Sequence, residues 1–169
     1  MLKVLIADDE RIVRKTLRLI GNWDEYEMEI VGEAQNGMEA LEMIDQLKPD
    51  ILLLDMKMPG LSGNQILEQL TGDRKRIHVI VISGYDDFEY ARTAISYGVS
   101  QYIMKPIDYN EMQKLLTTMH EELEKEYAEK MNRTRLENIY TESIPLLRQQ
   151  FFTQLLTETL TEDYCTLQM

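Results

Sequence analysis

One stretch in the middle of the chain, residues 49–60, constrains the fold more than any other. Its four consecutive aliphatic residues, 51–54, are entered by Pro-Asp and followed by Asp55 and then by a Pro-Gly turn. A short apolar run between turn residues is typical of a strand buried on both faces, as in the centre of a parallel sheet. Asp55 stands where this strand ends, and a carboxylate there is costly unless a cation, a donor or a chemical role compensates it.

Composition limits what such a chain can bind. Its 169 residues, 44% hydrophobic and 28% charged, suit one domain with an extension. The net charge of -12 argues against direct binding of nucleic acid or of an anionic membrane, because both depend on clustered Lys and Arg. The single cysteine, Cys165, allows no internal disulfide or zinc site, and no apolar run reaches about twenty residues. We therefore expect a cytoplasmic protein without a membrane anchor.

Strand and helix patterns alternate along the first 120 residues. The predicted strands are 2–7, 29–34, 51–54, 77–82 and 100–104, and the predicted helices are 11–20, 37–47, 62–70, 86–97 and one that begins near Glu111. Strands alternating with helices through short turns are typical of an open parallel sheet with right-handed crossovers. The sequence predicts a flavodoxin-like (βα)5 α/β fold with the five-stranded parallel order 2-1-3-4-5.

Polar residues stand at the carboxyl ends of four predicted strands, where such sheets bind ligands. Asp8 and Asp9 follow the first strand, and Asp55 follows the third. Ser83 follows the fourth strand and Lys105 the fifth. Three carboxylates repel one another unless a divalent cation lies among them, and magnesium prefers oxygen ligands. The pattern predicts a magnesium site with Asp9 and Asp55 as direct ligands and Asp8 bound directly or through water.

The same edge holds the groups that phosphoryl transfer needs. Lys105 supplies a positive charge and Ser83 a hydroxyl donor, which together neutralise a transferring phosphoryl group. Asp55 is placed to act as the nucleophile and become an acyl phosphate. Taken alone, the acidic pair at 8–9 also suits a helix N-terminus and Asp55 a turn, so the prediction depends on the combination.

Four motifs together resemble the receiver domain of two-component response regulators. They are Ala-Asp-Asp-Glu at 7–10, Leu-Asp-Met-Lys-Met-Pro-Gly at 54–60, Ile-Ser-Gly-Tyr at 82–85 and Tyr-Ile-Met-Lys-Pro at 102–106. Their joint spacing is specific, whereas no single motif is, and the resemblance covers about residues 1–120. Segments 32–37, 83–91 and 144–152 further resemble the subgroup whose receivers are joined to AraC-type DNA-binding domains.

This resemblance implies roles for particular residues. A sensor histidine kinase would phosphorylate Asp55, and magnesium would be held by Asp8, Asp9, Asp55 and the backbone carbonyl of Lys57. Lys105 would pair with the phosphoryl group.

The resemblance also implies a conformational switch. The bond between Lys105 and Pro106 would be cis. Ser83 and Tyr102 would form the switch pair, in which the hydroxyl moves toward the phosphoryl group and the ring turns inward. A tyrosine in an edge strand is usually explained by ordinary packing, so the switch role of Tyr102 rests mainly on the resemblance. The domain would be a signalling phosphoacceptor with its own autophosphorylation and autodephosphorylation chemistry, and not an enzyme.

The C-terminal third predicts a long helix. Apolar positions continue beyond Met112 without Gly or Pro until Pro145. We predict a receiver at 1–120, an extended helix at 121–144 and a separate short helical segment with a tail at 145–169. The extended helix is either a solvated charged face or a coiled-coil linker, and we expect a homodimer through this helix, through a receiver face, or through both. No helix-turn-helix follows residue 145, so either DNA contact comes from a domain absent from this chain or the regulator has a different output.

Other functions use similar residues. A magnesium-dependent phosphatase resembling the haloacid dehalogenases would need Asp-x-Asp on the first strand, but here Asp55 follows the third strand and residue 57 is Lys. A receiver-like module that dimerises without phosphate would not need the complete set of acidic residues, Ser83 and Lys105. A flavodoxin is disfavoured because an acidic loop repels a phosphate that comes without metal.

Overall fold

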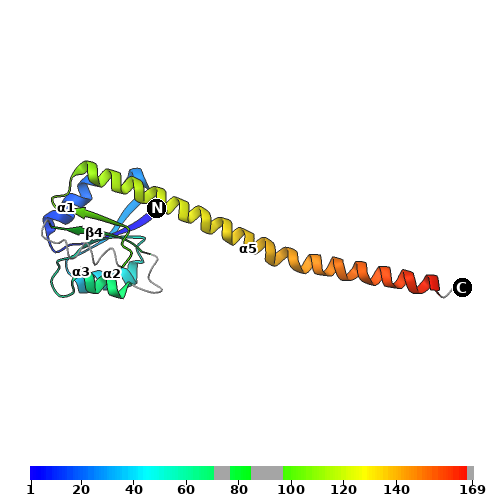
Figure 1. Ribbon diagram of the computed structural model, residues 1–169. Helices are drawn as coiled ribbons and strands as arrows, with labels where there is room; N and C mark the ends of the chain where they lie inside the picture. The colour runs from blue at the N-terminus through cyan, green and yellow to red at the C-terminus, as the bar shows by residue number, and fades with distance from the viewer. Residues whose placement is uncertain (71–76, 85–96, 167–169) are drawn as a thin grey trace. The chain divides into compact units, whose positions relative to one another are not determined.

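The computed structural model describes residues 1–70, 77–84 and 97–166 (Figure 1). The chain divides into two units, Met1–His120 and Glu121–Met169. The strands are β1 (Leu2–Ala7), β2 (Met28–Ala34), β3 (Ile51–Asp55), β4 (His78–Ser83) and β5 (Gln101–Met104). The helices are α1 (Arg11–Ile20), the 3-10 helix η1 (Trp23–Tyr26), α2 (Gly37–Leu47), α3 (Gly63–Gln69) and α5 (Tyr109–Thr166).

The five strands form one parallel sheet in the order β2-β1-β3-β4-β5. Every residue of the central strand β3 is buried, as its continuous apolar sequence predicts. The structure therefore confirms the predicted flavodoxin-like fold. The helix predicted at 86–97 lies almost entirely outside the described residues.

Helices cover both faces of the sheet. Figure 1 shows α1 and the first turns of α5 on one face, with α2 and α3 on the other. On the second face, buried residues of α2 and α3 pack against alternate residues of β1, β3 and β4. The first face receives Leu17 from α1 together with Met112, Leu116 and Met119 from α5, all fully buried.

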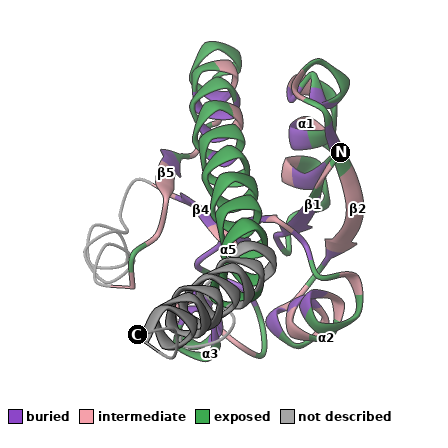
Figure 2. Cartoon of the chain, turned by 90° about the vertical axis from the view of Figure 1, so that its right-hand side faces the viewer, coloured by how far each residue is buried: buried purple, intermediate pink, exposed green. Residues whose placement is uncertain are grey.

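The buried stripe of α1 differs from the one that its apolar residues suggest. The helical spacing of Ile12, Val13, Leu17 and Ile20 predicts that these residues share the buried face. Ile12 is instead 72% exposed, and the buried residues of this helix are Arg14 and Leu17. In Figure 2, α1 carries both buried and exposed segments. Residues three apart share a helix face, so Arg14 lies above Leu17 against the sheet. The expectation fails because the guanidinium of Arg14 finds partners that a count of apolar residues does not consider.

A side-chain cap fixes the start of α2. The position of Asn36 directly before the predicted helix 37–47 predicts an N-cap, and its Oδ1 atom does accept a hydrogen bond from the backbone N–H of Glu39 at 2.9 Å. The carboxylate of Glu39 accepts from the backbone N–H of Gln35 at 2.8 Å, one residue earlier than a capping box requires.

The helix α5 continues through Pro145 as far as Thr166. The prediction of a separate helix after this proline is therefore wrong. Proline removes one backbone hydrogen bond, here to the carbonyl of Thr141, and costs about 3 kcal/mol in a helix interior. Residue 141 is exposed, so water can hydrogen-bond to that carbonyl. The helical turns on both sides of Pro145 offset the rest of the free-energy cost. None of the described helices combines the length and the hydropathy of a membrane span.

Candidate functional site

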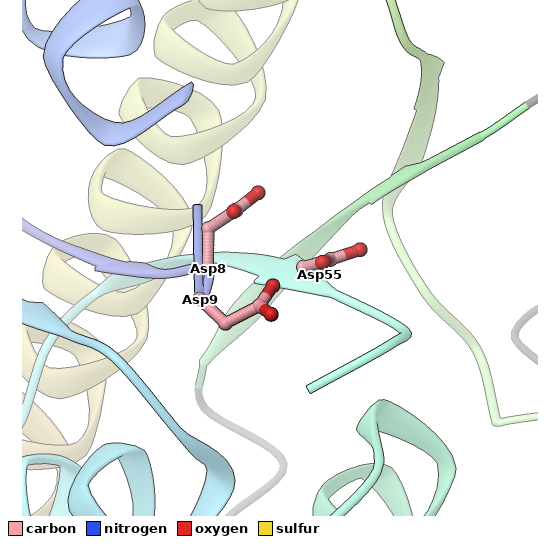
Figure 3. A group of neighbouring side chains, drawn as sticks. All are labelled: Asp8, Asp9 and Asp55. Carbon is pink, nitrogen blue, oxygen red and sulfur yellow. The ribbon is translucent and has the colours of Figure 1, made fainter. Parts of the chain in front are cut away.

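Three carboxylates meet at the carboxyl edge of the sheet (Figure 3). Each of Asp8, Asp9 and Asp55 offers an oxygen within 4.8 Å of the others. Asp8 is fully buried, Asp55 is 4% exposed, and Asp9 is exposed. The three converge because β1 and β3 are paired neighbours, with Ala7 opposite Leu54, so that both strands end at the same place.

Lys105 reaches this cluster from the end of β5. Its Nζ atom lies 3.0 Å from Oδ2 of Asp8 and 3.3 Å from Oδ2 of Asp55. The same ammonium lies 3.0 Å from Oε1 of Glu10, a contact that was not predicted from the sequence. One ammonium thus faces several carboxylates, and this leaves negative charge that a divalent cation would offset.

Burial changes the proton affinity of the buried carboxyl groups. Burial and, to a smaller extent, the nearby charge of Asp8 together raise the pKa of Asp55 from its ordinary 3.8 to about 6, against the opposing effect of Lys105. Burial also raises the pKa of Asp8. Burial lowers the pKa of Lys105, but its contacts with Asp8 and Glu10 and the charge of Asp55 raise it more, to above its ordinary range. Lys105 therefore remains charged at neutral pH.

Ser83 and Tyr102 lie on two further strands of the sheet, β4 and β5. Ser83 ends β4 and is fully buried, one residue beyond Ile82, which is paired with Asp55. Tyr102 is paired with Val81 and packs, half-buried, against the core. Alternate strand residues share a face, so Ser83 and Tyr102 lie on the same face as diagonal neighbours.

Two backbone features complete the site. The N–H of Lys57 donates to Oδ1 of Asp55 at 3.4 Å, which places the backbone of residue 57 beside the acidic cluster. The N–H of Lys105 donates to the carbonyl of Ser83 at 2.8 Å and joins the ends of β4 and β5. The peptide bond between Lys105 and Pro106 is cis.

The sequence patterns did not reveal Arg14 as part of this region. This buried residue of α1 donates from Nη1 to the carbonyls of Asp8 at 2.7 Å and of Asp9 at 3.2 Å. Its spacing from Leu17 was the available signal, because it places a charged residue on the buried stripe.

A parallel five-stranded α/β domain with an acidic cluster and a lysine at its carboxyl edge has the architecture of a phosphoacceptor signalling domain. The response regulator receiver domain family matches residues 4–117, and the chain belongs to this family.

Known proteins of this kind are similar to the chain. It is 35% identical over 138 residues to the uncharacterized transcriptional regulatory protein YesN of Bacillus subtilis (strain 168), covering 82% of this chain and 38% of that protein. It is 40% identical to the REC domain of AraT, a response regulator from Geobacillus stearothermophilus, with a TM-score of 0.72 over 75% of this chain and 98% of that one.

A two component transcriptional regulator AraC from Clostridium phytofermentans ISDg is 31% identical, with a TM-score of 0.63 over 70% of this chain and 92% of that one. The chain spans less than half the length of the curated relatives it matches. It is thus similar to the receivers of transcriptional response regulators.

Proposed function

We propose that Asp55 accepts a phosphoryl group from a sensor histidine kinase and that this reaction controls a larger transcriptional regulator. The observation that carries the proposal is the convergence of Asp8, Asp55 and Lys105 at the ends of three different strands, where the ammonium of Lys105 lies 3.0 Å from Asp8 and 3.3 Å from Asp55. An enzyme of the haloacid dehalogenase kind would place its nucleophile on the first strand, whereas Asp55 ends β3, the central strand.

The chemistry proposed for these residues is nucleophilic displacement. A carboxylate oxygen of Asp55 attacks the phosphorus of a phosphohistidine, the P–N bond breaks, and its electron pair leaves with the imidazole. With a pKa of about 6, Asp55 is mostly ionised at pH 7, as a nucleophile must be. Lys105 then balances charge on the incoming group, since its ammonium already lies beside Asp55.

The donor set fits magnesium. The carboxylates of Asp8, Asp9 and Asp55 and the backbone carbonyl of Lys57 are oxygen ligands, which this hard cation prefers. When bound, magnesium would supply positive charge that offsets the carboxylates and the phosphoryl oxygens. This proposal rests on the 4.8 Å cluster and on the burial of two of its members.

The switch proposal assigns Ser83 to the phosphoryl group and Tyr102 to the space that the hydroxyl leaves. Their placement as diagonal neighbours on one face of β4 and β5 supports this assignment. The change in conformation would then alter homodimerisation through α5 or through a receiver face. DNA contact and cytoplasmic location are parts of the same proposal, the former through another part of the regulator because this chain carries a net charge of -12.

The test is the intact mass of the chain after incubation with acetyl phosphate and Mg²⁺. We expect one phosphate on the wild-type chain and none on Asp55→Asn or in the presence of EDTA. Asp45→Asn, an exposed carboxylate on α2, is the matched control and should behave as wild type. Phosphate retained on Asp55→Asn would contradict the assignment, and no phosphate on wild type would favour the phosphate-independent module.

A further inference from the structure

One buried guanidinium holds the loop after β1, which carries Asp8 and Asp9. Arg14 is 6% exposed and is the fourth residue of α1. Its Nη1 atom donates to the carbonyl of Asp8 at 2.7 Å and to the carbonyl of Asp9 at 3.2 Å. Both peptide groups that follow these acidic residues are therefore tied to one side chain.

Arg14 is itself positioned from the neighbouring strand β2. Its Nε atom lies 3.4 Å from Oε2 of Glu33, which is paired with Ile6 of β1. The other carboxylate oxygen, Oε1, accepts from Nε of Arg18 at 2.9 Å and from Nη2 of Arg18 at 2.6 Å. Two arginines one helical turn apart thus share one carboxylate, but of these two Arg14 has the contacts to the loop.

The remaining contacts of the loop show how fully Asp8 is oriented. Its backbone N–H donates to the carbonyl of Ala34 at 3.1 Å, and its Oδ1 accepts from the N–H of Glu10 at 2.8 Å. Its Oδ2 forms the ion pair with Lys105. Arg14 provides the contact to the carbonyl of this residue and extends the same restraint to the exposed Asp9.

A buried arginine needs a reason, because burying a charge is costly unless it is paired and hydrogen-bonded. Here the guanidinium donates hydrogen bonds to two neutral carbonyls and forms an ion pair with Glu33. The burial of Arg14 and its two contacts with carbonyls indicate that it stabilises the conformation of the loop.

We propose that Arg14 is a positioning residue for divalent-cation binding. By holding the carbonyls of Asp8 and Asp9, it keeps both carboxylates directed at a common point. The inference rests on the proposed function, since it assumes that these carboxylates bind magnesium. Groups that orient metal ligands typically contribute 10–100-fold to metal affinity.

Electrostatics alone predicts the opposite change in Mg²⁺ affinity when Arg14 is replaced. The positive charge of Arg14 lies near the acidic cluster and opposes the approach of a cation. Removing that charge would tighten Mg²⁺ binding if charge were its only influence. Weaker binding after its removal therefore identifies positioning.

The experiment is a titration of the full chain with MgCl₂, followed by amide NMR shifts, for wild type and three variants. We expect the Mg²⁺ dissociation constant to rise roughly tenfold or more in Arg14→Met. Arg14→Lys should show a smaller rise, because an ammonium lacks the planar fork that holds several acceptors at once. Arg18→Met removes an equal charge that shares Glu33, and should stay within about twofold of wild type.

Phosphorylation by acetyl phosphate gives a second readout. Arg14→Met should need more Mg²⁺ for half-maximal rate, yet approach the wild-type rate at saturating Mg²⁺, because the nucleophile Asp55 is unchanged. Thermal unfolding without metal, measured in parallel, separates a loss of fold from a loss of affinity.

The outcomes are distinguishable. A wild-type chain that binds no Mg²⁺ would overturn the proposed function and this inference together. A wild-type chain that binds Mg²⁺, with equal or tighter binding in either folded variant of Arg14, would overturn the inference alone. If Arg14→Met does not fold, Arg14→Lys provides the test, because the inference also requires its Mg²⁺ dissociation constant to exceed that of wild type.

Discussion

Asp55 stores unfavourable charge in the protein without metal. Its folded-state pKa of about 6 exceeds the ordinary 3.8, so the folded state binds this proton more tightly than the unfolded state. The contribution of Asp55 to stability therefore falls as pH rises from about 4 to about 6 and stays low above that range. Proximity of Asp8, whose pKa is raised by burial, acts in the same direction.

We expect Asp55→Asn in EDTA to be more stable than wild type at pH 7 by roughly 1–3 kcal/mol, because the amide carries no charge. The advantage should shrink toward pH 4, where the wild-type carboxyl is protonated. Urea unfolding at both pH values checks this, with Glu42→Gln, at an exposed position of α2, as the control. A variant that is less stable than wild type at pH 7 would show that the ionised carboxylate of Asp55 does not destabilise the folded state.

Magnesium should relieve the same destabilisation. A ligand that binds only the folded state stabilises it by about 2.7 kcal/mol at one hundred times its dissociation constant. We expect MgCl₂ to raise the melting temperature of wild type, EDTA to reverse the rise, and Asp55→Asn to respond much less. Differential scanning calorimetry makes the measurement, with NaCl of equal ionic strength as the control. An equal response of both chains would place the ion elsewhere.

The sequence predicted the residues of the site better than their supports. Asp8, Asp55 and Lys105 could be predicted from the sequence, because each stands at the end of a strand and the ends of parallel strands lie at the same edge of the sheet. Glu10 and Arg14 were not, since their contacts depend on where side chains of α1 point. An arginine within an amphipathic helix is ordinarily read as solvated. The spacing of Arg14 from Leu17 places it on the buried stripe, but only the structure shows that it donates to backbone carbonyls.

At the scale of elements, the start of α2 depends on one hydrogen bond. Asn36 satisfies the N–H of Glu39, one of the donors left unpaired at a helix start. We expect Asn36→Ala to lower the free energy of unfolding by about 1 kcal/mol. Gln46→Ala, at an exposed position of the same helix, should change it by less than about 0.5 kcal/mol. Equal effects in urea unfolding would mean that the cap contributes nothing.

Element types followed from the sequence where local chemistry and burial agree. For the central strand β3 and the capped helix α2, the turn residues, the cap and the apolar pattern all predict the same type of element. Prediction failed at Pro145, because a proline predicts a helix end locally while α5 continues on both sides of it. It also failed at Ile12, where periodicity alone could not tell which apolar residues face the sheet.

For the whole molecule, the decisive question is what α5 contributes beyond the receiver. From Glu124 to Thr141 every residue of this helix is exposed, and the exposed residues include large apolar ones. They are Tyr127, Met131, Leu136, Ile139 and Tyr140, from 49% to 71% exposed. Large apolar side chains exposed along one helix are typical of an interface, so we expect a second copy to cover them.

We expect residues 1–123 to fold alone, because this segment holds the sheet and all described buried residues of α5. It should self-associate more weakly than the full chain, since it lacks the exposed apolar positions of α5. Sedimentation equilibrium of both chains checks this, at concentrations where the full chain is dimeric. In the full chain, Met131→Glu should weaken association and Glu129→Ala, at an exposed polar position, should not. Unchanged association after truncation would assign the dimer to a receiver face, because the apolar residues beyond 123 would then be dispensable.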